Sequence, residues 1–157
     1  MSALNHFHVS RNRHFRAPAL IAAIVVVGSL AAAGPVAAEE MGDAVAGEKI
    51  FKKCKACHKI GDGAKNSVGP VLTGVLGRPA GTVEGYRYGK GMKAAREKGL
   101  VWDTELVFAY LADPKKFLRE FTGDKRAKAK MVFKLKDEDD RRNVIAYLQS
   151  FSEPRTN

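Results

Sequence analysis

The chain has 157 residues, 45% of them hydrophobic, which is long enough for one domain with a buried core and short for two. Its 27 Lys and Arg residues outnumber 17 Asp and Glu residues, so the formal net charge is +10 at pH 7. This excess favours acidic docking surfaces as partners. The longest basic stretch, KRAKAK at 125–130, fits a solvated loop, and we expect no nucleic-acid partner.

The first 38 residues differ in kind from the rest. They carry three arginines and no acidic residue, and an apolar run, ALIAAIVVVGSLAAAG, fills 19–34 before PVAA. This order is typical of an export signal, and Val36 and Ala38 suit cleavage after Ala38. We therefore predict a signal peptide at 1–38, a mature domain at 39–157 and a periplasmic location. An uncleaved membrane anchor is the alternative, although the run is short for a hydrocarbon core of about 30 Å.

Helical periodicity begins soon after the leader. Apolar residues predict a helix from Asp43 to about Ala56, with Cys54 on its apolar face. The segment 59–85 is rich in Gly and Pro and predicts a folded loop, because apolar residues punctuate it. A short helix is expected at 92–98.

Two further helical regions follow. Asp103 or Thr104 can cap a helix that runs to Leu111, and the Asp-Pro pair at 113–114 ends it before a shorter helical segment. The acidic residues of KDEDD favour the start of a last helix, which continues through RRNVIAYLQSF at 141–151. The chain beyond the leader shows no run of alternating β-branched residues, so we predict an all-α fold.

The motif CKACH contains the only two cysteines of the chain, Cys54 and Cys57, and the only histidine beyond the leader, His58. Structural zinc needs four Cys or His ligands, and no second pair exists. A thiol-exchange site normally lies at a strand-to-helix junction, which this pattern lacks. A structural disulfide between these cysteines would close a very small loop and constrain little of the unfolded chain.

Covalent haem uses all three residues of the motif. Each thiol adds to a vinyl group of the porphyrin, and the histidine becomes an axial ligand of the iron. The preceding export signal strengthens this interpretation, because the attachment takes place outside the bacterial cytoplasm. One haem c per chain is the expected cofactor.

With these motifs in order, the sequence resembles the class I c-type cytochromes, most closely the soluble bacterial cytochrome c2 and c550 type, which is related to mitochondrial cytochrome c. GEKIFKKCKACH is similar to the first helix and haem site of that family, and VGPVLTGVLGR to its haem-covering loop. GLVWDTELVFAYLADPKKF, KMVF and NVIAYL resemble the middle helices, the methionine loop and the last helix. The resemblance covers nearly all of 43–151 and implies a cytochrome c fold around one haem.

The resemblance also implies roles for single residues. His58 would be the proximal iron ligand, with its other ring nitrogen donating to the Pro70 carbonyl, and Met131 the distal ligand. Met92, in a short helical segment, fits a surface or gap-filling role better. Tyr110 would lie near the sulfur of Met131. The haem propionates would meet three residues: Arg78, Tyr88 and Trp102.

The resemblance further implies a monomeric electron carrier, not an enzyme, with the cytochrome bc complex as donor and a terminal oxidase or photosynthetic reaction centre as acceptor. A membrane-tethered carrier and a haem enzyme or gas sensor with a displaceable distal ligand are the alternatives. The segment 115–130 is longer than its mitochondrial counterpart, which leaves its conformation open. Seven lysines flank the motifs that would surround an exposed haem edge: Lys53, Lys55, Lys65, Lys115, Lys116, Lys128 and Lys130. As a ring they would steer an acidic partner.

Overall fold

The computed structural model describes residues 42–152, so the predicted signal peptide at 1–38 lies outside the described residues. Within the described range the elements are α-helices, joined by turns and one isolated bridge between Pro79 and Val101. The helices are α1 (Ala44–Phe51), α2 (Lys90–Glu97), α3 (Thr104–Ala112), α4 (Pro114–Thr122) and α5 (Glu138–Gln149). The all-α prediction is therefore confirmed.

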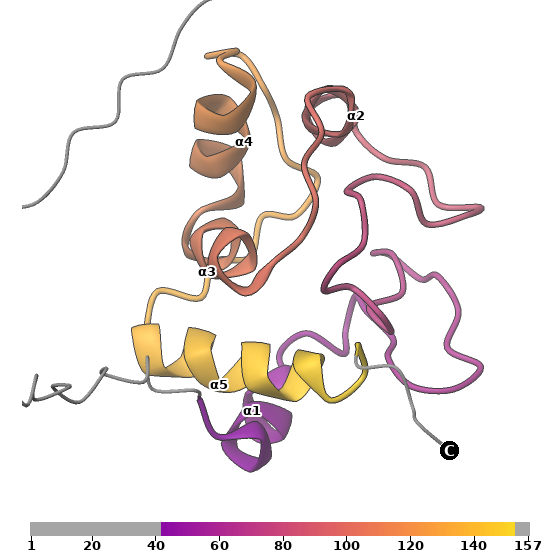
Figure 1. Cartoon of the computed structure of the whole chain (residues 1–157), viewed down its shortest axis with the longest axis vertical. Coiled ribbons are helices and arrows are strands. Elements are labelled where there is room, and N and C mark those ends of the chain that lie inside the picture. The colour runs from indigo at the N-terminus through magenta and orange to yellow at the C-terminus, as the bar shows by residue number, and fades with distance from the viewer. Residues whose placement is uncertain (1–41, 153–157) are drawn as a thin grey trace, which may run out of the picture. The chain divides into compact units, whose positions relative to one another are not determined.

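The first and last helices cross at close range. Figure 1 shows α1 against α5, and α5 also packs against α3. The crossing is close because Gly47 of α1 has no side chain, and a methyl group there would overlap the backbone of Asn143. Phe51 packs against Tyr147, with 5.2 Å between ring centroids and the rings tilted by 48°. This packing fixes the end of α1, from which the CKACH motif continues.

Helix α1 is shorter than predicted. It ends at Phe51, not near Ala56, and residues 52–57 form a series of turns. The amide of Cys54 bonds to Phe51 O at 2.7 Å, a three-residue step that tightens the chain where an α-helix would make a four-residue one. Both cysteines therefore lie in turns after the helix.

The boundary between α3 and α4 depends on one aspartate. Asp103 caps α3 by accepting from the Leu106 amide, and Asp113 caps α4 by accepting from the Lys116 amide. Pro114 stands in the first turn of α4, where its missing N–H costs nothing. The second segment was predicted to be shorter, which is wrong, since both helices have 9 residues. Part of the long segment 115–130 is therefore helical.

The remaining helix boundaries lie within a few residues of those predicted. Helix α2 starts at Lys90 instead of 92 and ends at Glu97. Asp137 caps α5, whose first turn is acidic, and α5 ends at Gln149, so Phe151 lies in the turn that follows. Among residues 42–152, no helix is both long and apolar enough to span a bilayer.

The core takes buried side chains from each of the described helices, and the Gly- and Pro-rich segment 59–85, a loop in Figure 1, adds Val75 and Ala80. Several half-buried apolar side chains pack against this core without being covered on all sides. They include Cys54, Leu72, Met92, Tyr110, Phe121, Ala129 and Met131.

Candidate functional site

The CKACH motif forms a compact hydrogen-bonded turn. The amides of Cys57 and His58 donate to Cys54 O at 3.0 and 2.9 Å. Both cysteines carry free thiols, with Cys54 half-buried and Cys57 exposed. Burial raises the pKa of the Cys54 thiol to about 11, even though Lys53 opposes the shift. A thiol-exchange nucleophile needs a depressed pKa, so this environment disfavours such chemistry.

The imidazole of His58 is half-buried and has one ring nitrogen committed. Nδ1 lies 2.7 Å from the carbonyl oxygen of Pro70. A carbonyl can only accept, so Nδ1 carries the proton and Nε2 keeps its lone pair. Burial lowers the pKa of His58, and the bond to Pro70 acts in the opposite direction. Neutral imidazole with a bare Nε2 is the form that binds a metal.

Gly69 lets the loop lie directly on this ring. A methyl group on Gly69 would overlap the imidazole of His58, so no other residue fits without displacement of the ring or the loop. The amide of Gly69 also donates to Cys57 O at 2.7 Å, which joins the loop to the CKACH turn. The glycine of the Val-Gly-Pro sequence is thus explained by the close approach of the loop to the His58 ring.

Two residues that the sequence analysis did not single out hold this loop in place. Asn66 accepts from the Val71 amide at 3.0 Å and donates to Glu84 O at 2.8 Å. Tyr86 donates its hydroxyl proton to Val68 O at 2.8 Å. The residues around Pro70 are therefore bonded to a segment some eighteen positions later. No local pattern could indicate these contacts.

Arg78 and Trp102 lie side by side through their backbones. Trp102 N donates to Arg78 O at 3.0 Å, and the guanidinium of Arg78 donates to Thr73 O and Val71 O, both at 2.9 Å. An arginine has five N–H donors, so these bonds leave capacity for an anion. Burial lowers the pKa of Arg78. Their predicted contact with propionates stays a prediction.

Aromatic rings cluster next to Trp102. Tyr110 meets Trp102 edge to face at 5.0 Å between centroids and Phe117 at 5.5 Å. Burial raises the pKa of Tyr110 well above its usual range, and the nearby hydroxyls of Tyr86 and Tyr88 add to this. Burial also raises the pKa of Tyr88, while Arg78 opposes it. Tyr110 and Trp102 are thus in contact through their rings, and Trp102 and Arg78 through their backbones.

Met131 lies in the loop between α4 and α5 and packs, half-buried, against the core. The residues on its two sides differ. The ammonium of the preceding Lys130 donates to Arg87 O at 2.9 Å and lies 4.7 Å from the centre of the Tyr86 ring, whereas Val132 is 86% exposed. The place of Met131 relative to an iron or to Tyr110 stays a prediction.

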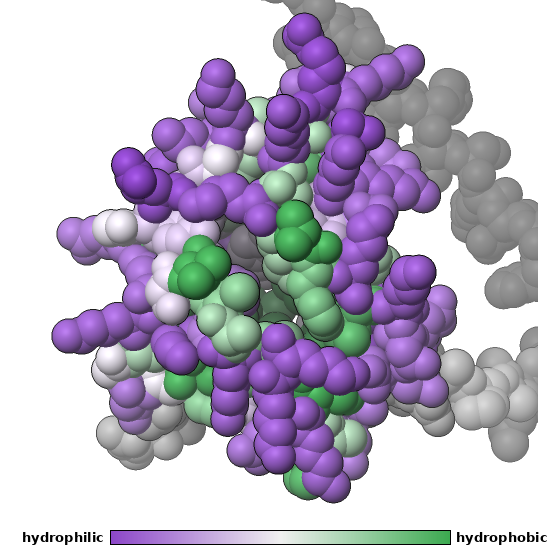
Figure 2. Space-filling model, turned by 180° about the vertical axis from the view of Figure 1, so that it is seen from behind, coloured by the Kyte–Doolittle hydropathy of each residue, from purple (hydrophilic) through white to green (hydrophobic). Residues whose placement is uncertain are grey.

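The shape and chemistry of the site fit a haem. Figure 2 shows a face that is hollowed at its centre, with apolar side chains around the opening and polar ones outside them. Free thiols, a neutral imidazole and a half-buried thioether are the donors that c-type haems use. Cys54, Cys57, His58 and Met131 could therefore hold one.

All seven lysines of the predicted ring are exposed, but they are not equivalent. Lys53 pairs with Asp140 at 3.3 Å, and Lys116 with Glu120 at 3.8 Å. Lys130 is engaged with the Arg87 carbonyl and Tyr86. Lys55, Lys65, Lys115 and Lys128 are the better candidates for an encounter with an acidic partner.

The family model described as cytochrome c matches residues 44–152. The chain belongs to the cytochrome c family. It is 53% identical over 117 residues to cytochrome c2 iso-1 of Rhodospirillum centenum, which covers 71% of this chain and 98% of the relative. It is 47% identical over 137 residues to cytochrome c2 of Cereibacter sphaeroides, which covers 82% of this chain and 93% of the relative.

Solved structures agree with this assignment. Cytochrome c2 of Rhodospirillum centenum superposes with a TM-score of 0.69 at 50% identity, covering 71% of this chain and all of that one. Cytochrome c2 of Rhodobacter sphaeroides gives a TM-score of 0.67 at 48% identity, covering 72% and 99%. As a cytochrome c, the chain has covalently bound haem c as its cofactor and transfers electrons to and from partners, and it is not an enzyme.

Proposed function

We propose that this cytochrome c is a soluble periplasmic carrier whose single haem is bound through Cys54 and Cys57, with His58 and Met131 as axial ligands. The observation that carries the proposal is the His58–Pro70 hydrogen bond of 2.7 Å, which leaves Nε2 bare within the turn that holds both free thiols. No other chemistry of this motif explains why a half-buried imidazole is neutral, oriented and placed directly after two thiols.

When bound, haem c supplies one-electron chemistry by cycling between ferrous and ferric iron. The chain sets the conditions for that chemistry. The Pro70 carbonyl orients His58, and the Met131 thioether favours the ferrous state. Arg78, Tyr88 and Trp102 are assigned to the propionates, and Tyr110 to the surroundings of Met131. Ligation by both His58 and Met131 would leave the iron no open position for a substrate.

Charge and the named relatives support the partner assignment. Export by a cleaved signal at 1–38 would place the 39–157 domain in the periplasm, where we assign the cytochrome bc complex as donor. A terminal oxidase or a photosynthetic reaction centre is the acceptor. The similarity to proteins called cytochrome c2 in Rhodospirillum centenum and Cereibacter sphaeroides supports a place between such a donor and acceptor. Exposed lysines suit brief encounters of the monomer with acidic docking surfaces.

Two measurements test the ligation and the export. The oxidised protein should show the iron-to-methionine charge-transfer band and should not bind carbon monoxide at neutral pH when reduced. Ready carbon monoxide binding would instead support a sensor with a displaceable distal ligand. The purified protein should begin at Glu39, whereas an intact leader would support a membrane-tethered carrier.

The partner assignment needs a separate experiment. Isolated bc complex should reduce the purified protein, and oxidase and reaction-centre preparations should then reoxidise it in a parallel screen. Failure of the bc complex to reduce the protein would contradict the proposed donor without affecting the proposed ligation.

A further inference from the structure

Arg141 is a buried cation in the first turn of α5. Its side chain is 6% exposed, whereas that of the adjacent Arg142 is 42% exposed. Burial of a charge is costly unless hydrogen bonds compensate for it. The Nε–H of Arg141 is the one fully buried side-chain polar group without a partner within the described residues. The contacts of the other guanidinium atoms must therefore offset the cost of burying this charge.

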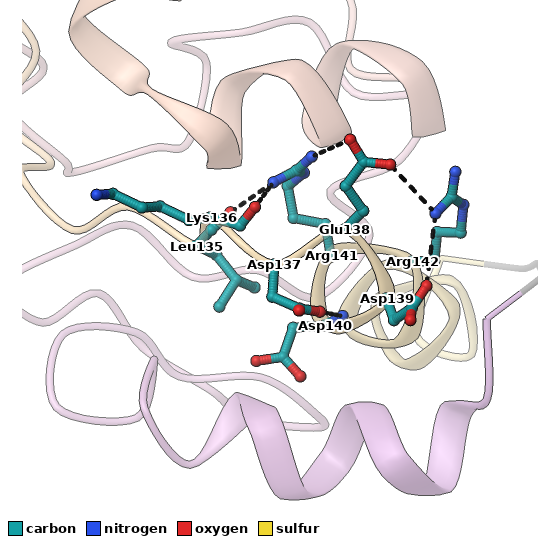
Figure 3. Close-up of polar contacts among 8 residues, drawn as sticks. All are labelled: Leu135, Lys136, Asp137, Glu138, Asp139, Asp140, Arg141 and Arg142. Atoms are coloured by element: carbon teal, nitrogen blue, oxygen red, sulfur yellow. Dashed lines mark hydrogen bonds and ion pairs between the residues drawn. The ribbon is translucent and has the colours of Figure 1, made fainter.

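The guanidinium holds the chain that leads from Met131 to α5. Nη1 of Arg141 donates to Leu135 O at 2.9 Å and to Lys136 O at 2.6 Å (Figure 3). Its central carbon lies 4.2 Å from the centre of the Phe108 ring on α3. Glu138 faces it at 3.6 Å and is itself exposed. The guanidinium thus joins α3, α5 and the end of the methionine loop.

Leu135 is the point at which this loop returns to the core. Its side chain is 4% exposed, and its amide donates to Leu111 O at 2.8 Å. The guanidinium of Arg141 donates to the carbonyl of Leu135, so both backbone polar groups of Leu135 are fixed. In contrast, Val132 and Phe133 are 86% and 38% exposed. Residues 132–134 are exposed, and the contact of Lys134 with Asp113 at 2.6 Å is the other link between this stretch and the helices.

We propose that Arg141 is a positioning residue for Met131, which it keeps near the iron by fixing the loop at Leu135. The inference rests on the proposed ligation by Met131. Upstream, the Lys130 bond to Arg87 O fixes the loop on the other side of the methionine. Loss of the downstream contact would let the segment open locally while the helices stay packed. The fraction of molecules with Met131 away from the iron would then increase.

The test compares three variants of the holoprotein. Arg141→Met removes the donors but keeps an unbranched apolar side chain, and Arg141→Lys keeps the charge and a donor. Arg142→Met is the matched control, since Arg142 also pairs with Glu138 and lies 5.3 Å from Phe108, but the bonds to Leu135 O and Lys136 O come from Arg141. Imidazole titration of the ferric protein measures how readily Met131 is displaced.

The expected result is a rise of about tenfold in apparent imidazole affinity for Arg141→Met, because that affinity scales with the fraction of open molecules. Arg141→Lys should lie between this variant and the wild type, and Arg142→Met should match the wild type. In a titration with the denaturant guanidinium chloride, the methionine charge-transfer band of Arg141→Met should also disappear at a lower concentration than the helical circular dichroism signal. Wild-type imidazole affinity in a folded Arg141→Met would overturn the inference.

Two further outcomes remain decisive. If Arg141→Met does not fold, Arg141→Lys decides, and wild-type imidazole affinity and wild-type amide exchange at Leu135 in that variant would overturn the inference. If the wild-type protein itself lacks the charge-transfer band, the proposed ligation fails and the inference fails with it. The band in the wild type therefore distinguishes the two failures.

Discussion

The carbonyl of Pro70 accepts a hydrogen bond of 2.7 Å from Nδ1 of His58. This single bond decides which ring nitrogen keeps its lone pair, and the loop that supplies it is bonded on several sides. Gly69 lies against the ring, Asn66 bonds to Val71, and Tyr86 bonds to Val68. The orientation of His58 is therefore a property of the whole 66–71 loop and of the segment that supports it.

Gly69→Ala should disturb this arrangement, because the added methyl overlaps the imidazole. We expect a loss of about 1 to 3 kcal/mol in the free energy of unfolding, the usual cost of overpacking. Gly89→Ala is the control, since its methyl would meet only the Lys130 side chain, at 3.0 Å, and no ring or backbone, and it should cost less than about 1 kcal/mol. Guanidinium unfolding of both variants measures the difference. Equal costs would mean that the ring and the loop can separate freely.

Asn66→Ala should loosen the Pro70 loop from the 83–88 segment. It removes one bond to the Val71 amide and one to Glu84 O, which together contribute about 1 to 3 kcal/mol to stability. The neighbouring Ser67→Ala changes an exposed side chain and should be nearly neutral. Amide exchange at Val71 should accelerate in the first variant only. Unchanged exchange there would show that Asn66 does not support the loop.

Asp113 connects the start of α4 with the methionine loop. Lys134 Nζ lies 2.6 Å from its carboxylate, and this bond and the Lys116 amide hold the pKa of Asp113 below its usual value. Because the pKa is depressed, the carboxylate stabilises the folded state at pH values above its unfolded-state pKa of about 3.9. This contribution is lost as the pH falls through the pKa of the folded state.

Asp113→Asn should therefore be less stable than the wild type at pH 7, and this difference in stability should become smaller as the pH falls. Asparagine still caps α4, so the change isolates the pair with Lys134. Asp103→Asn, at the equivalent cap of α3, is the control. Thermal unfolding from pH 7 down to pH 3 measures this difference for both variants. A difference for Asp113→Asn that is constant over this range would contradict the role of its charge.

The exposed lysines make a prediction about rates. Reduction of the protein by isolated bc complex should become slower as ionic strength rises, because salt screens steering between unlike charges. Lys128→Gln should weaken that dependence more than Lys49→Gln, which removes an exposed charge from α1. Stopped-flow rates at several salt concentrations provide the slopes. Reduction rates that do not change with ionic strength would exclude electrostatic steering by the lysine ring.

Local patterns predicted most of the fold, and long-range contacts explain what they missed. Asp103, Asp113 and the acidic start of α5 act over a few residues, so the helices that they begin could be placed. The end of α1 could not, because three-residue turns at 52–57 replace the last helical turns. The length of α4 was underestimated: the helix continues to Thr122 and ends only where Gly123 takes a left-handed conformation at φ 70°.

In the candidate site, too, local motifs predicted some residues, and others depend on contacts that no local pattern indicates. The CKACH motif and the resemblance to c-type cytochromes selected His58 and Pro70, and the bond between them is present. Asn66 and Arg141 were missed, because each acts on a carbonyl that periodicity cannot place: Glu84 for the first, Leu135 for the second. The contact of Asn66 spans the fold, and the contact of Arg141 depends on how the loop before α5 turns back, so neither has a signature in the surrounding residues.

The most direct test of the account is the visible and near-infrared absorption of the oxidised protein and two methionine variants. The wild type should show the iron-to-methionine charge-transfer band, Met131→Ala should lose it and bind carbon monoxide when reduced, and Met92→Ala should keep it. Absence of the band in the wild type, or its survival in Met131→Ala, would contradict axial ligation by Met131.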